Sequence, residues 1–345
     1  MRKSFPVVFA AAGLALALAG CAGGTAAPAP KASATAEVPA KDLTPIAMKI
    51  GYTAIGAAYS DLYVCEDEGI FTKNGLDVEL VFLNSSSQLV PALASGSVDV
   101  GAGVARTTAA GVMKGVDLRY IALPIPYYYM EMWGHESIKS PADLKGKKIG
   151  LSSPGSLGDA SVDAWLKEMG WTDKDVQKTF LKSSTAEVTA LKQGAVDAIV
   201  TQPPTGTQTR DFGAVKIMDF TKYDAAANAY HVTGKYLDAN KEAVTRFVKS
   251  EVDCLALLHK DKAKAVASII KHTTNPDQAL AEYSYDFFEP LWAKNPAIDP
   301  SLVDAAFDLA VALGDGTKPS DTAKYVDNSF VKALDKSGYI DGLYK

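Results

Sequence analysis

The sequence predicts an α/β protein built from two similar halves, because two short tracts recur in the same order. Lys49-Ile-Gly-Tyr-Thr53 recurs as Lys148-Ile-Gly-Leu-Ser152, and Ala92-Leu-Ala-Ser-Gly-Ser-Val-Asp-Val100 recurs as Ala190-Leu-Lys-Gln-Gly-Ala-Val-Asp-Ala198. The two tracts begin 43 residues apart in the first copy and 42 in the second. Two copies are too few for a solenoid, although helix–glycine–strand junctions resemble one another in many α/β proteins. The nearly equal spacing favours two lobes with a cleft between them, where small ligands bind.

In the first half, alternating apolar residues predict strands, and helical periodicity that ends at a glycine predicts helices. Asp61 is expected to cap a helix that ends at Gly69, and Asn84-Ser-Ser-Ser87 opens a helix that stops at Gly96. Strands that alternate with helices indicate βαβ units and a mostly parallel sheet. The expected strands are 46–52, 77–83, 98–101 and 118–123, and a further helix is expected at 106–114.

In the second half, the same alternation continues and then changes to helices. Pro124 and Pro126 mark the end of the first lobe, and Ser184 with Glu187 predicts a capping box for the helix that ends at Gly194. The expected strands are 127–133, 196–200, 215–218 and 230–233, and the segment 144–150 leads into Leu151. A helix is expected at 159–169, and the C-terminal part reads as helices at 243–258, 262–271, 279–288 and 301–313.

The N-terminus has the features of a bacterial lipoprotein signal. Arg2 and Lys3 precede an apolar stretch that is too short to span a membrane, and Leu18-Ala19-Gly20-Cys21 resembles the lipoprotein processing site. We therefore expect a signal peptide at 1–20, lipid attachment at Cys21 and a flexible tether at 21–44. The alternative is an ordinary secretory signal with an incidental cysteine.

Composition excludes several function classes. The 345-residue chain has a net charge of −5 and no dense run of Lys or Arg, so we expect no nucleic-acid partner. The histidines show no metal-ligand spacing, and no nucleophile elbow, Walker loop or dinucleotide fingerprint is present. We therefore expect neither a metal nor a cofactor. Cys65 and Cys254 lie in helix-like stretches and are interpreted as buried small hydrophobes, although an oxidising compartment would permit a disulfide.

Five tracts appear in order along the chain: Ile50-Gly-Tyr, Glu68-Gly-Ile-Phe-Thr-Lys-Asn-Gly-Leu-Asp-Val78, Ala92-Leu-Ala-Ser-Gly-Ser-Val-Asp99, Asp143-Leu-Lys-Gly-Lys-Lys-Ile-Gly150 and Ala190-Leu-Lys-Gln-Gly-Ala-Val-Asp197. With these tracts the chain resembles the solute-binding proteins of ABC importers for nitrate, aliphatic sulfonates, taurine and thiamine-precursor pyrimidines, over roughly residues 46–335. The resemblance implies two Rossmann-like lobes joined by two crossover segments, the type II periplasmic-binding fold. It places lobe 1 at 45–125 and 230–345, the latter largely helical, and lobe 2 at 126–229.

The predicted ligand site lies at the carboxyl ends of the strands, where open α/β sheets bind ligands. Serine clusters at two helix starts offer hydroxyls and free amides that favour an anion, although plain helix capping explains each cluster equally well. Pro203 is similar to the residue that ends the strand beside the ligand in relatives. The candidate residues are Thr53, Tyr59, Asp61, Ser85, Ser86, Ser87, Val104, Arg106, Tyr127, Ser153, Gly155, Ser156, Thr201, Gln202 and Pro203.

Three of these candidates have two interpretations each. Arg106 is either a bidentate clamp for a carboxylate, sulfonate or phosphate, or a solvated arginine at a helix start. Asp61 is either a helix cap or a cleft residue that favours an amine or a ring N–H. Tyr127 shares one strand face with Tyr129 and is either an aromatic wall of the cleft or part of the core.

These observations predict a lipid-anchored extracytoplasmic receptor that is a monomer and makes or breaks no bond. It would deliver a small polar solute to a membrane permease driven by a cytosolic ATPase. A sulfonate-, nitrate- or taurine-like anion is the first expectation for the solute, and a pyrimidine or other aromatic vitamin-like compound is the alternative. A second alternative is an enzyme similar to the thiamine-pyrimidine synthase, but the cysteine cluster that the family links to that activity is missing here.

Overall fold

The computed structural model describes residues 44–83, 86–273 and 275–345. The predicted signal peptide, Cys21, nearly all of the predicted tether and Ser85 lie outside the described residues. None of the helices in the described ranges is both long and apolar enough to cross a membrane.

The first sheet has five strands in the order β2-β1-β3-β10-β4. β1 pairs in parallel with β2 and β3, whereas β10 is antiparallel to both of its neighbours. β10 therefore returns to this sheet after the chain has completed a second one. The strands are β1 (Ile46–Tyr52), β2 (Leu76–Phe82), β3 (Val100–Gly103), β4 (Leu118–Tyr127) and β10 (Asp224–Thr233).

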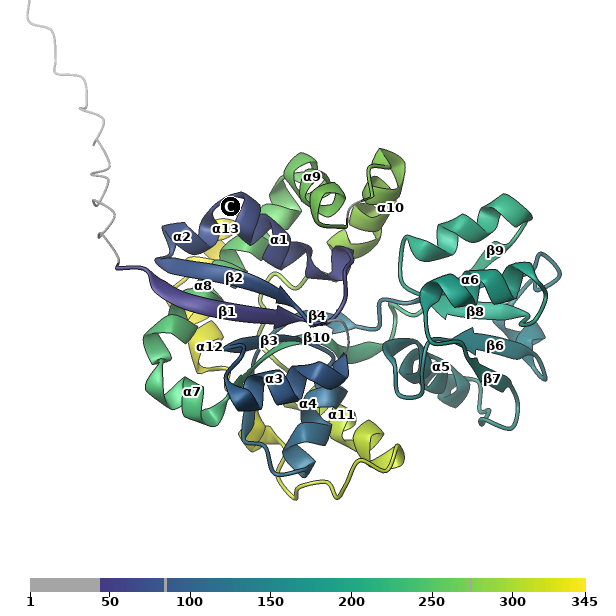
Figure 1. Cartoon of the computed structure of the whole chain (residues 1–345), viewed down its shortest axis with the longest axis horizontal. Helices are drawn as coiled ribbons and strands as arrows, with labels where there is room; N and C mark the ends of the chain where they lie inside the picture. The colour runs from purple at the N-terminus through teal and green to yellow at the C-terminus, as the bar shows by residue number, and fades with distance from the viewer. Residues whose placement is uncertain (1–43, 84–85, 274) are drawn as a thin grey trace, which may run out of the picture. The chain divides into compact units, whose positions relative to one another are not determined.

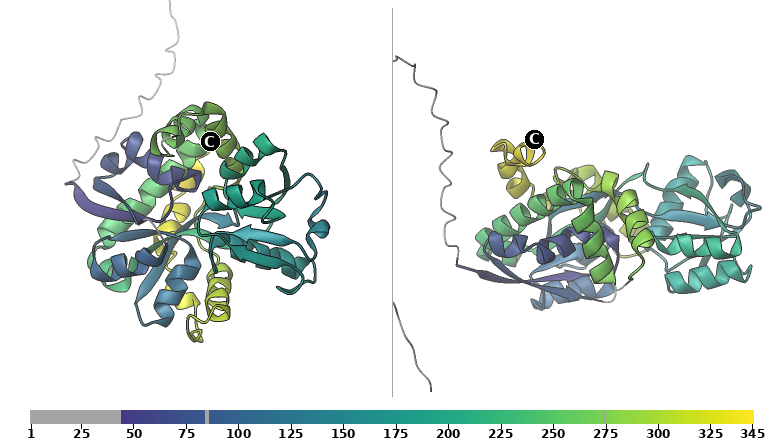
Figure 2. Two further views of the ribbon diagram at one scale, coloured as in Figure 1. Left: turned by 45° about the vertical axis from the view of Figure 1, so that its right-hand side comes forward. Right: turned by 90° about the horizontal axis from the view of Figure 1, so that it is seen from above.

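The second sheet has the equivalent order β7-β6-β8-β5-β9, with the antiparallel strand again in fourth place. The predicted fold class, two α/β units with a helical C-terminal part, is confirmed, but both sheets are mixed rather than mostly parallel. Figures 1 and 2 show the two sheets as separate layers within residues 44–345. The strands are β5 (Glu131–Gly134), β6 (Lys148–Leu151), β7 (Gln177–Phe180), β8 (Ala198–Thr201) and β9 (Val215–Asp219).

The repeated tracts form the same local structure in both sheets. The carboxylate of Asp99 accepts a hydrogen bond from the Lys49 amide at 2.8 Å, and Asp197 accepts the equivalent bond from the Lys148 amide at 2.8 Å. Each tract also contains a glycine with positive φ at the end of its helix, 73° at Gly96 and 69° at Gly194, a conformation that disfavours a side chain. The sequence repeat is therefore a structural repeat of helix, turn and strand.

Helices cover both faces of each sheet, and apolar side chains fill each interface. One face of the first sheet is covered by α3, α4 and α11, from which Leu89 and Phe307 enter the core. The other face is covered by α1 and α8, and Phe247 of α8 packs there (Figure 1). On the second sheet, Trp165 of α5 and Leu191 of α6 lie in separate clusters. The helices of the two sheets are α1 (Ser60–Asp67), α2 (Ile70–Lys73), α3 (Leu89–Ser95), α4 (Ala105–Met113), α5 (Leu157–Glu168) and α6 (Ser184–Lys192).

The C-terminal part is helical, as predicted. Its long helix α8 packs against α1, and α11 packs against α4. These helices are α7 (Gly234–Ala239), α8 (Lys241–Lys260), α9 (Lys262–Thr273), α10 (Gln278–Phe288), α11 (Pro300–Ala312), α12 (Ser329–Lys336) and α13 (Tyr339–Leu343).

The predicted strand at 127–133 is wrong. β4 continues through Pro124 and Pro126 to Tyr127, and the next strand, β5, begins only at Glu131. β4 is the edge strand of its sheet, and beyond it lies only an isolated bridge from Tyr120 to Val326. A proline without an amide hydrogen therefore breaks no ladder on that side. Because residues 128–130 are not a strand, Tyr127 and Tyr129 do not share a strand face.

The interpretation of the two cysteines was also wrong. Cys65 of α1 and Cys254 of α8 form a disulfide, with 5.5 Å between their Cα atoms. They are 189 residues apart in sequence, and helical periodicity alone does not show that α1 and α8 are neighbours.

Candidate functional site

A cavity of about 980 Å³ lies where the loops at the carboxyl ends of both sheets meet. Thr53 follows β1 and Val104 follows β3 on one wall. Ser153 follows β6, Lys182 follows β7 and Gln202 follows β8 on the other wall. This is the edge at which α/β sheets bind ligands, because the carboxyl ends of their strands and the starts of the following helices meet there.

Most of the predicted site residues line this cavity, although binding by them stays a prediction. Asp61, Tyr127, Thr201 and Pro203 do not line it. Tyr127 packs at the edge of the first-sheet core, and Pro203 lines a smaller cavity beside Ile55. The lining residues among those predicted are Thr53, Tyr59, Ser86, Ser87, Val104, Arg106, Ser153, Gly155, Ser156 and Gln202.

Asp61 is neither a helix cap nor a cleft residue. The N-cap of α1 is Tyr59, and the Asp61 side chain is fully buried, where Tyr230 Oη donates to its Oδ2 at 2.6 Å. Glu251 of α8 lies beside it, and burial raises the pKa of both carboxyls. The charge of Asp61 raises the pKa of Glu251 further, so this pair holds a proton inside the core.

Arg106 lines the cavity, but its charge is already paired. Its Nη1 donates to Oδ2 of Asp315 at 2.6 Å, and the side chain is one-fifth exposed. Asp315 also pairs with Lys114 at 3.3 Å. A ligand anion at Arg106 would therefore compete with Asp315 for the guanidinium.

The predicted anion cradle at residues 153–156 is also occupied by an acid of the chain itself. Oδ2 of Asp159 accepts the Gly155 amide at 2.8 Å, and the Asp159 amide donates to Oγ of Ser156. Lys178 pairs with the same carboxylate at 2.9 Å. The Ser156 amide donates to the Ser153 carbonyl, so the amides of Gly155 and Ser156, which were expected to be free, already have acceptors within the chain.

The sequence analysis did not select two charged residues of the second wall. Lys182 lies in the left-handed region at φ 71°, where its amide donates to the Ser152 carbonyl at 2.7 Å. Its side-chain ammonium has no ion-pair partner in the described part of the chain. Lys182 is therefore a free cation on the cavity wall.

Glu187 is the second of these residues, and its position corrects the predicted capping box. The N-cap of α6 is Ser183, whose Oγ accepts from the Ala186 amide at 3.2 Å, rather than Ser184. This shift by one residue places Glu187 one position beyond the site from which a glutamate reaches back to the cap. Its side chain is 1% exposed, and among the described residues Oε2 has no hydrogen-bond partner. Burial raises the pKa of Glu187 to about 8, and the neighbouring Thr201 hydroxyl lowers it by less.

Aromatic and apolar side chains complete the cavity. Tyr129, rather than the predicted Tyr127, lines it together with Tyr59, Phe82 and Met130. Oη of Tyr59 is hydrogen-bonded to Oγ1 of Thr53 at 2.9 Å, which fixes the ring against the wall. A flat or partly apolar ligand therefore finds an apolar surface here.

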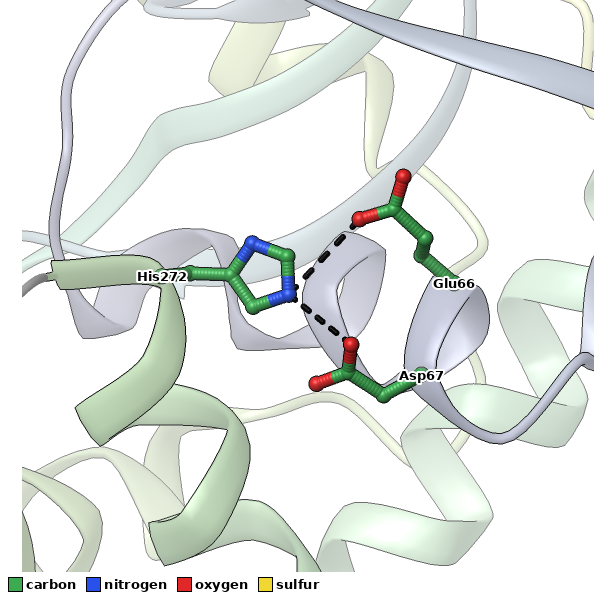
Figure 3. A group of neighbouring side chains, drawn as sticks. All are labelled: Glu66, Asp67 and His272. Atoms are coloured by element: carbon green, nitrogen blue, oxygen red, sulfur yellow. Dashed lines mark hydrogen bonds and ion pairs between the residues drawn. The ribbon is translucent and has the colours of Figure 1, made fainter.

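A separate cluster of Glu66, Asp67 and His272 lies away from this cavity on α1 and α9 (Figure 3). Nε2 of His272 lies 3.1 Å from Asp67 Oδ1 and 3.7 Å from Glu66 Oε2, and its ring stacks on Tyr63. Carboxylate and imidazole groups are common metal ligands, but the spacing of these residues in the sequence did not indicate that they are neighbours. However, Lys271 pairs with the same Asp67 oxygen, and Ser268 donates to the other. The cluster is therefore already balanced by a cation of the chain.

The strand order of both sheets and the cavity at their carboxyl ends define a protein of the type II periplasmic-binding fold. The chain belongs to the NMT1/THI5-like family, whose model matches residues 57–265. The fold is shared with the periplasmic aliphatic sulphonate binding protein of Escherichia coli. That structure superimposes with a TM-score of 0.68 at 20% identity, over 79% of this chain and 93% of that one.

Two curated relatives differ in what their descriptions say. A protein of Brucella abortus described as a binding protein is 31% identical over 212 residues, which are 59% of this chain and 64% of the relative. The 4-amino-5-hydroxymethyl-2-methylpyrimidine phosphate synthase of Uromyces fabae is 29% identical over 142 residues, 40% of each chain. The matched region thus spans less than two thirds of either relative.

Proposed function

We propose that the chain is the extracytoplasmic substrate-binding lipoprotein of an ABC import system. In this proposal, Cys21 carries the lipid anchor in the bacterial cell membrane, and a permease with a cytosolic ATPase receives the solute. Lobe 1 comprises residues 45–125 and 230–345, and lobe 2 comprises 126–229. The family membership and the fold support the receptor class.

The single observation that carries the proposal is the cavity of about 980 Å³ between walls that belong to different sheets. A solute that touches Thr53 and Tyr59 on one wall and Ser153 and Gln202 on the other would stabilise the arrangement in which the walls are close. Only such a difference in affinity shifts an open–closed equilibrium. The permease would then recognise the closed form.

The solute we propose is a small polar organic compound with an anionic group, such as a sulfonate. The free ammonium of Lys182 supports an anion at the second wall. Nitrate alone would fill little of a cavity of about 980 Å³. It would also make no apolar contact with Phe82, Tyr129 and Met130 of the walls. The same aromatic side chains favour the second candidate, a pyrimidine or other aromatic vitamin-like solute.

A thermal-shift screen of the mature, tag-free domain tests the proposal. A solute that binds only the native state raises the melting temperature by mass action. We expect a sulfonate or a pyrimidine to raise it by several degrees and to be recovered unchanged after long incubation. Chemical conversion of the bound compound would instead indicate the enzyme alternative, and failure of every compound in both classes would contradict the receptor.

A matched pair of lysine variants then locates the anionic group. Lys182→Ala should weaken sulfonate binding about tenfold, because it removes the free cation of the cavity wall. Lys174→Ala removes an exposed lysine of the same lobe that lies outside the cavity, and it should leave the affinity unchanged. Equal affinities in both variants would remove Lys182 from the site.

A further inference from the structure

Glu187 is a buried acid on the cavity wall, and one of its carboxyl oxygens is left without a hydrogen bond by the described residues. Its side chain is 1% exposed, and no described residue makes a hydrogen bond to Oε2. An acid at a helix start that served only the helix dipole would be exposed and would have a lowered pKa. Glu187 has the opposite properties, because burial raises its pKa to about 8. Stabilisation of α6 therefore does not explain this residue.

The repeated tract shows what the fold requires at this position. Ala92 in the first copy corresponds to Ala190 in the second, so Glu187 corresponds to Leu89. Leu89 is fully buried over the end of β3, where a Cβ on Gly103 would lie 3.0 Å from Leu89 Cδ2. The second copy has Thr201 at the place of Gly103, and Thr201 is the neighbour of Glu187.

An apolar residue therefore satisfies the fold at this helix turn, as it does in the first copy. The second copy instead holds a carboxyl group that is removed from water and whose Oε2 has no hydrogen bond from the described residues, which is unfavourable for folding. Such a group is expected where a ligand supplies the missing hydrogen bond. The Thr201 hydroxyl lies close enough to lower the pKa of this carboxyl, but it leaves Oε2 without a hydrogen bond of normal geometry among the described residues.

We propose that Glu187 is the specificity residue of the cavity and accepts a hydrogen bond from nitrogen of the solute, either an amine or an amino group on a heterocycle. The inference rests on the proposed receptor function, since it requires a solute in the cavity. It narrows the solute class to one that pairs an N–H donor for Glu187 with an anionic or aromatic part for the remaining wall. A solute without an N–H would offer no donor to the Glu187 carboxyl.

Two matched pairs of probes test the inference, because each pair differs only in the amino group. The pairs are 2-aminoethanesulfonate with ethanesulfonate, and 4-aminopyrimidine with pyrimidine. In calorimetry at pH 7 we expect the wild type to bind at least one amino compound ten or more times tighter than its partner. Glu187→Leu should reduce that ratio to within twofold. Glu136→Leu, which changes an exposed glutamate outside the cavity, should keep the wild-type ratio.

A proton measurement separates a direct contact from a structural effect. When the ammonium group of 2-aminoethanesulfonate binds, the Glu187 carboxyl is expected to give up its proton to the buffer. Titrations in buffers of different ionisation enthalpy should show this release in the wild type and not in Glu187→Leu. A melting temperature of Glu187→Leu no lower than that of the wild type would show that the variant is folded.

The outcomes distinguish this inference from the receptor proposal. Equal binding of both members of each pair by the wild type, or an unchanged ratio in Glu187→Leu, would overturn the role of Glu187 and leave the receptor standing. Absence of binding by all four probes would overturn both. A copurified molecule without N–H, identified by mass spectrometry, would likewise support the receptor and exclude the role of Glu187.

Discussion

The two sheets of the chain are built alike and differ where their strands end. In both copies a left-handed glycine follows the helix, at Gly96 and Gly194, and an aspartate then fixes the start of the neighbouring strand. The first helix turn, however, carries Leu89 in one copy and Glu187 in the other. The residues that determine the backbone are thus the same in both halves, whereas a residue that faces the cavity is not. Function is therefore best sought at the positions where the copies differ.

The copies also differ in how they are stabilised. The first sheet is covered by the C-terminal helices, and the Cys65–Cys254 disulfide joins α1 to α8. The second sheet has fewer helices of its own, and residues 126–229 contain no cysteine. The first half has a cross-link that the second lacks, so the two halves should respond differently to reducing agents.

The largest expected effect comes from exchanging the two residues. Leu89→Glu places an acid in the first-sheet core, where nothing pairs with it, and should lower the free energy of unfolding by about 4 kcal/mol. Glu187→Leu makes the reverse change and should not destabilise the protein, because leucine already fits the equivalent turn. Urea denaturation of both variants measures the difference. Similar losses in the two would show that the halves are not equivalent at this turn.

The disulfide should give the next largest effect. Changing both Cys65 and Cys254 to alanine should cost about 3 kcal/mol, since the cross-link closes a long loop in the unfolded chain. Dithiothreitol should lower the melting temperature of the wild type towards that of the double variant and leave the double variant unchanged. Two titratable thiols in the unfolded, unreduced wild type would contradict the disulfide.

Much of the fold was predictable because it depends on short-range patterns. The repeat, the glycine-terminated helices and the alternating strands predicted two α/β units and the edge at which the cavity lies. The antiparallel return of β10 and the continuation of β4 through Pro124 and Pro126 depend on which strand lies at an edge. Helical and strand periodicity in the sequence do not show which strand lies at the edge of a sheet.

The site was less predictable, because pairing between distant residues decides which groups are free. Arg106 looked like a free cation, but Asp315 lies 209 positions later and pairs with it. The amide of Gly155 looked free, but Asp159 accepts its hydrogen. Glu187 looked like half of a capping box, but the cap lies one residue earlier, and Oε2 of Glu187 has no hydrogen bond from the described residues. Alignment of the two copies was the sequence signal that would have found it, opposite Leu89.

A pH series sharpens the contrast between Leu89 and Glu187. Burial raises the pKa of Glu187 to about 8 in the folded protein, so the unfolded chain loses its proton first as pH rises. The contribution of Glu187 to the free energy of unfolding is therefore constant below the pKa of an unfolded glutamate, about 4.5, and falls as pH rises from there to about 8. Between pH 5 and pH 8 the wild type should lose on the order of 2–3 kcal/mol relative to Glu187→Leu. Contributions of the buried Asp61–Glu251 pair cancel, because both proteins contain it. Parallel stability curves would show that Glu187 ionises normally.

The smallest effect tests the equivalence of the copies themselves. Asp99→Ala and Asp197→Ala each remove a hydrogen bond of 2.8 Å to the amide of the lysine that begins a strand, at a cost of about 1–2 kcal/mol each. Both aspartates are half-buried, so the two losses should agree within about 0.5 kcal/mol, and the double variant should show their sum because the sites are far apart. Asp77→Ala, which changes an exposed aspartate on β2 without an ion pair in the described ranges, is the control and should change stability little. Unequal losses would mean that the matching tracts do not stabilise the two halves equally. The structural equivalence of Leu89 and Glu187 would then lose its support.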